Sequence, residues 1–374
     1  MKFGGYKMDL NDLLARYIEV NKKIENIDKI FQRYNPWSGE NVDNLINSFF
    51  EAINQKNSSF SWLDVEDKLK EFKNEKDLNI HFGIPNHIQG DISEAQLYLC
   101  LVNPNIDMNL KNENIFKYYE IASKKNSEDS SLNMLKIDDN GTIKISKDKN
   151  FIKEHIVNTS NNSSIPYREL LTINSKNGQE LPYYLGHYFA RLFMDILQKK
   201  EKVQSFFSNL DKNQLDVLKN ISKKIANLEA YPFRSQTPRF SLKDKKIKRF
   251  ANEIVSSESK VGMLSARIII WRIVKYLNNK DVEDKPIFLF RRFNTAWLPS
   301  IKNVLQIDLN YNTSETEEII QNLHHEFFFT IGGPNYNNST RSIGRNIYKG
   351  SSKLEYEEYK ETFVGPFYKY NKKI

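Results

Sequence analysis

The sequence has a single cysteine, Cys100, among its 374 residues. One cysteine excludes an internal disulfide and a zinc site built from several thiolates. Because Cys100 lies in an apolar run, a buried structural thiol is favoured over a nucleophile.

Long apolar runs are also missing. No stretch approaches the roughly 18 to 20 apolar residues that a membrane span requires, and the opening MKFGGYKMDLNDLL lacks the apolar core of a signal peptide. These absences predict a soluble, cytoplasmic protein that is not bound to a membrane.

Several catalytic signatures are missing as well. Neither standard Gly-rich phosphate loop is present, and no Ser-His-Asp pattern stands out. The adjacent His324 and His325 would point in different directions on a helix or a strand, and no third ligand accompanies them, which favours a structural role. The sequence therefore predicts neither a bound metal nor a cofactor.

The composition is that of a chain that can fold. Hydrophobic residues make up 39% and charged residues 27%, so a packed core is possible and global disorder is excluded. The formal net charge of +8 favours an anionic partner such as nucleic acid. A lysine-rich chain that is merely soluble is the alternative reading of the same charge.

The first part of the chain has helical periodicity. Apolar residues from Leu13 to Ile30 recur at helical spacing, and Asn35-Pro36-Trp37-Ser38-Gly39 interrupts the pattern. A second stripe runs from Val42 to Ile53, and Ser61 is placed to cap a third helix. We interpret residues 1–82 as an α-helical N-terminal arm, through which a protein partner could bind.

The remaining chain, residues 83–374, predicts an α/β domain. Short apolar runs bounded by turn residues are typical of buried strands in a parallel sheet. Helical patterns separate these runs, which predicts a central, mostly parallel sheet flanked by helices. A polar insertion at about 121–165 contains a possible hairpin turn at Asn140-Gly141. The predicted strands are 97–102, 225–228, 286–290 and 326–331.

Polar or special-backbone residues follow each predicted strand. In open α/β sheets, ligands bind beyond the carboxyl ends of the strands. Four such ends converging on one edge predict a binding site there, although any one of them could be an ordinary turn. The clusters are Asn103-Pro104-Asn105, Glu229 to Ser235, Arg291-Arg292, and Gly332 to Arg341.

The order of these four clusters resembles the motif order of the uracil-DNA glycosylase superfamily over roughly residues 83 to 350. The mismatch-specific branch of that family carries a Gly-Ile-Asn-Pro-Gly motif whose Asn orients the attacking water. Here Leu101-Val102-Asn103-Pro104-Asn105 keeps the Asn-Pro pair and lacks both glycines. The resemblance implies that Asn103 positions water.

The later motifs extend the resemblance. Glu229 falls at the family's base-reading position, where Asn is usual, and Arg291 ends a strand similar to the one before a short family helix. The segment from Gly332 falls where the family has its DNA-intercalating loop, without the His of that loop. The resemblance implies that Asn338, Ser339 and Arg341 contact the DNA strand.

Further candidates come from the chemistry that base excision requires. Asp107 could supply a carboxylate near Asn103, with a helix cap as the alternative role, and Asn105 could contact the ligand. Tyr119 and Phe233 could offer an aromatic face to a flipped base, with core packing as their alternative.

Basic residues near the second cluster are candidates for phosphate contacts. They are Arg234, Lys245 and Lys246. A solvated helix face is their alternative, and a structural salt bridge is the alternative for Arg291 and Arg341.

These observations predict a DNA-binding protein with a uracil-DNA glycosylase-like domain that hydrolyses the N-glycosidic bond of a modified or mismatched base. DNA is expected before RNA. One alternative is a non-catalytic nucleic-acid sensor or interaction module on the same fold. Another is an enzyme acting on a small nucleotide in the same crevice. Defence against foreign DNA is a further hypothesis that depends on fold resemblance alone.

Overall fold

The structure is a computed structural model that describes most of the chain. The described residues are 8–55, 60–72, 83–104, 135–137, 143–145, 150–173, 181–234, 259–332, 341–344 and 346–371.

The N-terminal region is helical, as predicted, but its helices differ from the expected ones. The pattern from Leu13 to Ile30 forms two helices, because Lys22 turns the backbone left-handed (φ 66°) and Asn26 caps a new helix by accepting from the Lys29 N–H. Ser61 caps a 3₁₀ turn instead of an α-helix. The elements are α1 (Leu10–Asn21), α2 (Ile27–Tyr34), α3 (Glu40–Asn54), η1 (Trp62–Val65) and η2 (Asp67–Phe72).

A mixed eight-stranded sheet forms the centre of the protein. The sheet order is β10-β9-β8-β7-β2-β6-β1-β5, and the four predicted strands are its parallel centre, β8-β7-β2-β6. The sheet is mixed because β1 pairs antiparallel with β6 and β9 pairs antiparallel with β8. The strands are β1 (Ile88–Gln89), β2 (Leu97–Leu101), β5 (Val157–Asn158), β6 (Ile225–Glu229), β7 (Ile287–Phe290), β8 (Phe328–Ile331), β9 (Ile347–Lys349) and β10 (Ser352–Lys353).

One predicted strand begins later than expected, and two strands pair on either side of the predicted Asn140-Gly141 turn. The strand expected from Glu326 begins at Phe328, because helix α13 (Thr313–Glu326) continues up to it. A separate hairpin pairs β3 (Leu135–Ile137) with β4 (Ile143–Ile145), and its Asn140-Gly141 turn lies outside the described residues.

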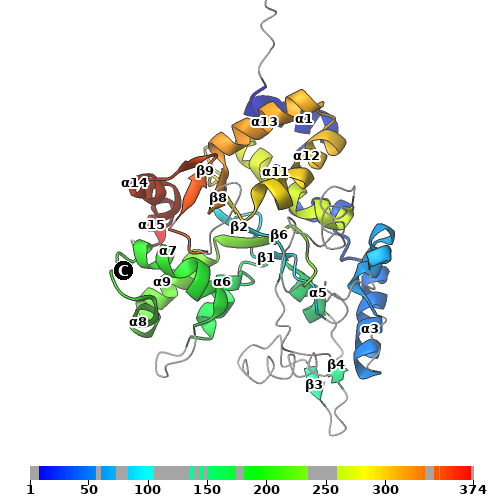
Figure 1. Ribbon diagram of the computed structural model, residues 1–374, viewed down its shortest axis with the longest axis horizontal. Coiled ribbons are helices and arrows are strands. Elements are labelled where there is room, and N and C mark those ends of the chain that lie inside the picture. The colour runs from blue at the N-terminus through cyan, green and yellow to red at the C-terminus, as the bar shows by residue number, and fades with distance from the viewer. Residues whose placement is uncertain are drawn as a thin grey trace, which may run out of the picture.

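Helices cover both faces of the sheet (Figure 1). One layer contains α1, α13, α11 (Lys260–Asn278), η6 (Phe293–Trp297), α12 (Leu298–Asn303) and η7 (Val304–Asp308). The opposite layer contains α6 (Ile165–Leu171), η5 (Leu185–Phe189), α7 (Ala190–Ile196), α8 (Val203–Ser208), α9 (Lys212–Ser222), α14 (Tyr356–Tyr359), η8 (Lys360–Val364), η9 (Gly365–Phe367) and α15 (Tyr368–Asn371). Helix α5 (Asn150–Ile156) precedes β5.

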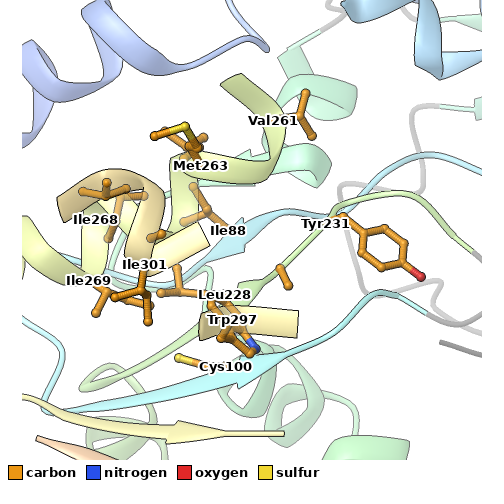
Figure 2. Packing of buried hydrophobic residues seen from close by; sticks show 14 of the residues in the cluster. Ile88, Cys100, Leu228, Tyr231, Val261, Met263, Ile268, Ile269, Trp297 and Ile301 are labelled. Atoms are coloured by element: carbon orange, nitrogen blue, oxygen red, sulfur yellow. The ribbon is translucent and has the colours of Figure 1, made fainter. Parts of the chain in front are cut away.

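Alternate residues of the central strands point into two hydrophobic clusters. On β2, Tyr98 and Cys100 face the α11 layer, whereas Leu99 and Leu101 face the α7 layer. Figure 2 shows Cys100 in the first cluster beside Trp297. Cys100 is buried and free, and burial raises the pKa of its thiol, as a structural cysteine requires.

The N-terminal helices pack into the same core as the α11 layer. The Trp271 indole N–H donates to the Glu25 carbonyl (2.8 Å), and the Tyr311 hydroxyl donates to the Asp12 carbonyl (3.0 Å). Side chains from α1, α2 and α3 join those of α11 in one cluster. A domain boundary at residue 82 stays a prediction.

The strand order creates a switch point. The chain leaves β2 toward β6 on one side, and it later leaves β7 toward β8 on the other side. A crevice forms where two neighbouring strands send the chain in opposite directions, at their carboxyl ends. The switch point therefore lies at the ends of β2 and β7, directly before Asn103 and Arg291.

Candidate functional site

The carboxyl ends of β2, β6 and β7 meet at one edge of the sheet, which we call the carboxyl edge. Leu101 pairs with Glu229 across β2 and β6, and the Arg291 N–H donates to the Cys100 carbonyl (2.9 Å) one residue beyond β7. Since side chains alternate along a strand, Glu229, Leu101 and Arg291 share the face that the α7 layer covers. Asn103 follows two residues after β2.

Glu229 is a buried carboxyl group. Its side chain is 2% exposed, and its Oε2 atom has no hydrogen-bond partner in the described part of the chain. Burial raises the pKa of Glu229 well above its ordinary value, and the opposing charges of Arg234 and Arg291 do not cancel this effect. The raised pKa favours the protonated form, in which Glu229 has an O–H that can donate and a carbonyl oxygen that can accept.

Asn227 lies two residues before Glu229 on the same face of β6. It is 2% exposed, and neither its amide nitrogen nor its amide oxygen has a hydrogen-bond partner among the described residues. Because buried polar groups are nearly always paired, the Asn227 amide can bind a water molecule or a ligand group next to Glu229. The sequence does not single out Asn227, because one polar residue inside a short apolar strand does not change the strand pattern.

Two tyrosines from the start of η5 lie over this face. The Arg291 Nη1 donates to the Tyr188 hydroxyl (2.8 Å), and the Tyr184 and Tyr188 rings stack 5.7 Å apart. Burial raises the pKa of Tyr188 to about 12, so the phenol stays neutral. Burial and the nearby Glu229 raise the pKa of Tyr184 as well. Their i, i+4 spacing is equally typical of core packing on a helix, so no sequence signal distinguishes them.

Glu169 holds the start of η5 in place. Its carboxylate accepts from the backbone N–H groups of Tyr184 (3.0 Å) and Leu185 (2.7 Å). Burial nevertheless raises the pKa of Glu169 to about 7, and the two hydrogen bonds oppose that shift. A carboxylate at the N-terminus of a helix also complements the helix dipole.

Arg234 is fixed by three neighbours. Its Nε donates to the Ile84 carbonyl (2.7 Å), and its Nη2 lies 3.1 Å from Nε2 of the buried His155. A Cβ on Gly83 would lie 2.8 Å from the Arg234 Cδ, so glycine makes room for this side chain. Burial and the arginine charge lower the pKa of His155, which stays neutral and can accept this hydrogen bond.

Phe233 and Asn103 are both engaged locally. Phe233 is 1% exposed and meets the Trp37 ring edge-on at 6.1 Å, so its ring is part of the core. Trp37 in turn donates to Nδ1 of the buried His87 (3.1 Å), whose pKa burial lowers to about 3. The Asn103 amide donates to the Pro104 carbonyl (3.0 Å).

Arg341 reaches the same region from the segment after β8. Its Nη1 donates to the Tyr183 hydroxyl, and its guanidinium lies 5.8 Å from the centre of that ring. The Ile343 N–H donates to the Tyr188 carbonyl (2.9 Å), which ties this segment to η5. Seven predicted site residues lie outside the described residues: Asn105, Asp107, Tyr119, Lys245, Lys246, Asn338 and Ser339.

The described residues contain no group of three or more His, Cys, Asp or Glu side chains placed to hold a metal ion. The His324 ring packs edge-on against Phe293 at 4.5 Å, and His325 Nδ1 lies 2.9 Å from the Glu326 carboxylate. Among the helices that the structure describes, none is long and apolar enough to cross a membrane.

Comparison with known proteins identifies no family for this chain. Scans of protein-family models, curated proteins and solved structures give no match to this chain. The function must therefore be argued from the carboxyl edge itself.

Proposed function

We propose that the protein binds DNA at the carboxyl edge and hydrolyses the N-glycosidic bond of a modified or mismatched base. One observation carries the proposal: Asn103, Glu229 and Arg291 follow three parallel strands that end at one edge, beside the switch point of the sheet. The motif resemblance to the uracil-DNA glycosylase superfamily supports the same activity.

In the proposed reaction, water adds to the anomeric carbon of the sugar as the carbon–nitrogen bond breaks. The bonding electrons pass to the base nitrogen, and the water proton passes to solvent. The Asn103 amide would orient the water. The Glu229 O–H and the Arg291 guanidinium would stabilise the charge that develops on the base. Burial increases the strength of such hydrogen bonds, because little water competes with them.

The test measures abasic sites in duplexes that contain uracil, mismatched or modified bases, after alkaline cleavage. We expect base release by the natural protein. Asn103→Ala should lower the rate about 100-fold, the usual scale for loss of one positioned polar group. Tyr356→Ala, an exposed tyrosine on α14, is the matched control. No abasic sites across the whole panel would reject hydrolysis.

A second candidate is a base-recognition module without hydrolysis. The observation that favours it is the Asn103 amide, which already donates to the neighbouring Pro104 carbonyl (3.0 Å). On this alternative, Glu229→Gln changes the preference among bases in a binding assay, whereas Asn103→Ala leaves binding unchanged.

A further inference from the structure

Beside the buried site, the carboxyl edge carries aromatic side chains at the surface. Tyr183 is 41% exposed, and His187, one helical turn later, is exposed as well. Their ring centres lie 4.7 Å apart, and Arg341 lies over the Tyr183 ring. We call Tyr183, His187 and Arg341 the aromatic platform.

These rings adjoin each other at the surface. A single exposed aromatic side chain is ordinary, but two adjoining exposed rings with a cation beside them offer a ligand both a stacking face and a positive charge. The Tyr183 ring also contacts Tyr184 (5.3 Å) and Tyr188 (6.3 Å), so the platform continues inward to the tyrosines that face Glu229.

The charge of the platform is not neutralised locally. Arg341 forms no ion pair with any described residue, and its hydrogen-bond partner is the neutral phenol of Tyr183. A guanidinium held by a neutral group keeps its full charge for an anion. Aromatic rings beside such a cation match the two parts of a nucleotide. The flat base can stack on a ring, and the phosphate can pair with the guanidinium.

Another exposed tyrosine provides a contrast. Tyr356 on α14 is 49% exposed and also has a cation over its ring, Lys360 at 4.8 Å. Glu355, Glu357 and Glu358 surround it in the chain, and Lys360 forms an ion pair with Glu357 at 2.8 Å. An acidic surface repels phosphate, so exposure alone does not make a nucleotide site.

We infer that the aromatic platform binds an unpaired nucleotide of single-stranded nucleic acid, with the base stacked on the Tyr183 ring, the tilted His187 ring (57° between the ring planes) beside it and the adjoining phosphate on Arg341. A base can stack on protein rings only when it is not stacked within a duplex. The inference rests on the proposed function for its choice of nucleic acid as the ligand, but it requires no hydrolysis.

The experiment compares two labelled probes by fluorescence anisotropy. One is a thymidine oligonucleotide of about ten nucleotides, a length within the usual range of single-strand sites. The other is an abasic oligomer of equal length, which keeps every phosphate and lacks the bases. We expect the natural protein to bind the thymidine probe about tenfold more tightly, the usual scale of one stacked base.

The variants separate stacking from charge. Tyr183→Ala should abolish the preference for the thymidine probe, Tyr183→Phe should keep it, and His187→Ala should reduce it. Arg341→Gln should weaken both probes alike and lower the slope of log affinity against log salt by about 1. Tyr356→Ala, the matched control, should bind both probes as the natural protein does.

Three outcomes would overturn the inference. They are equal binding of both probes by the natural protein, an unchanged preference in Tyr183→Ala, or displacement of the thymidine probe by polyglutamate as effective as by unlabelled oligonucleotide. The last would identify an acidic peptide as the ligand. The anisotropy assay measures binding and requires no release of a base, so a protein without hydrolytic activity can still give the expected result. Likewise, a platform that does not bind single strands leaves the hydrolysis assay unaffected.

Discussion

The two edges of the parallel strands hold their charged side chains differently. At the amino edge, opposite charges pair: Lys275 lies 3.2 Å from Glu94 and 3.0 Å from Glu283, and Lys369 lies 2.7 Å from Asp284. At the carboxyl edge, Arg234 donates to the Ile84 carbonyl, Arg291 to the Tyr188 hydroxyl and Arg341 to the Tyr183 hydroxyl. The charges of Arg234 and Arg291 also act on the buried carboxyl group of Glu229.

From this difference we assign a stabilising role to the amino edge and a binding role to the carboxyl edge. Paired charges at the amino edge neutralise each other and connect the starts of neighbouring strands. At the carboxyl edge, Arg234 and Arg291 lie near the buried carboxyl group of Glu229, and Arg341 adds a third positive charge, which favours an anionic ligand there. Glu229 ends β6 at this edge, and the buried amide of Asn227 lies two residues before it. We therefore expect substitutions at the two edges to have different effects.

The largest expected effect is at the amino edge. Arg272 is fully buried, donates to the Asp284 carbonyl (2.7 Å) and lies 3.5 Å from the Glu283 carboxylate. Arg272→Ala should lower the free energy of unfolding by about 3–5 kcal/mol, because it leaves a cavity in the core and removes the donor to the Asp284 carbonyl. Urea denaturation measures this change. Arg341→Ala at the carboxyl edge should change it by less than about 0.5 kcal/mol, and equal losses would contradict the comparison.

The next effect depends on pH. The pKa of Glu169 is raised from 4.5 to about 7, so the folded state holds its proton more tightly than the unfolded state does. Its stabilising contribution is complete below pH 4.5 and is lost as pH rises through 7. Relative to the natural protein, Glu169→Gln should therefore gain about 3 kcal/mol of stability between pH 4.5 and 7.5. Urea denaturation at both pH values tests this. A pH-independent difference would mean that Glu169 titrates normally.

The third effect compares one substitution at both edges. Glu283→Gln should lower the free energy of unfolding by about 2 kcal/mol, because it removes a charged partner from Arg272 and Lys275. Glu229→Gln should not destabilise the protein at neutral pH, since Gln resembles the neutral form of the acid, which burial favours. Thermal and urea unfolding measure both. Destabilisation by Glu229→Gln would show that Glu229 is an ionised structural partner.

Much of the sheet could be predicted from the sequence, because short apolar runs between turn residues leave few alternatives to buried strands. The outer strands β1, β5 and β10 could not, since each has only two residues and no apolar pattern. The helix break at Lys22 depends on a left-handed backbone that lysine does not signal.

The site was predictable only in part. Asn103, Glu229 and Arg291 follow predicted strands, so their common edge follows from parallel pairing. Tyr184 and Tyr188 could not be distinguished from core residues, because aromatic spacing on a helix is the same in both roles. The burial of Glu229 depends on the layer that covers it, which no local pattern encodes.

The most direct test of the central claim is to map where nucleic acid contacts the protein. Single-stranded DNA containing iodouracil would be photo-crosslinked to the natural protein, and the linked peptides would be identified by mass spectrometry. The account predicts crosslinks in the peptide that contains Tyr183 and His187. Crosslinks confined to the amino edge, around Lys275 and Lys369, would contradict it.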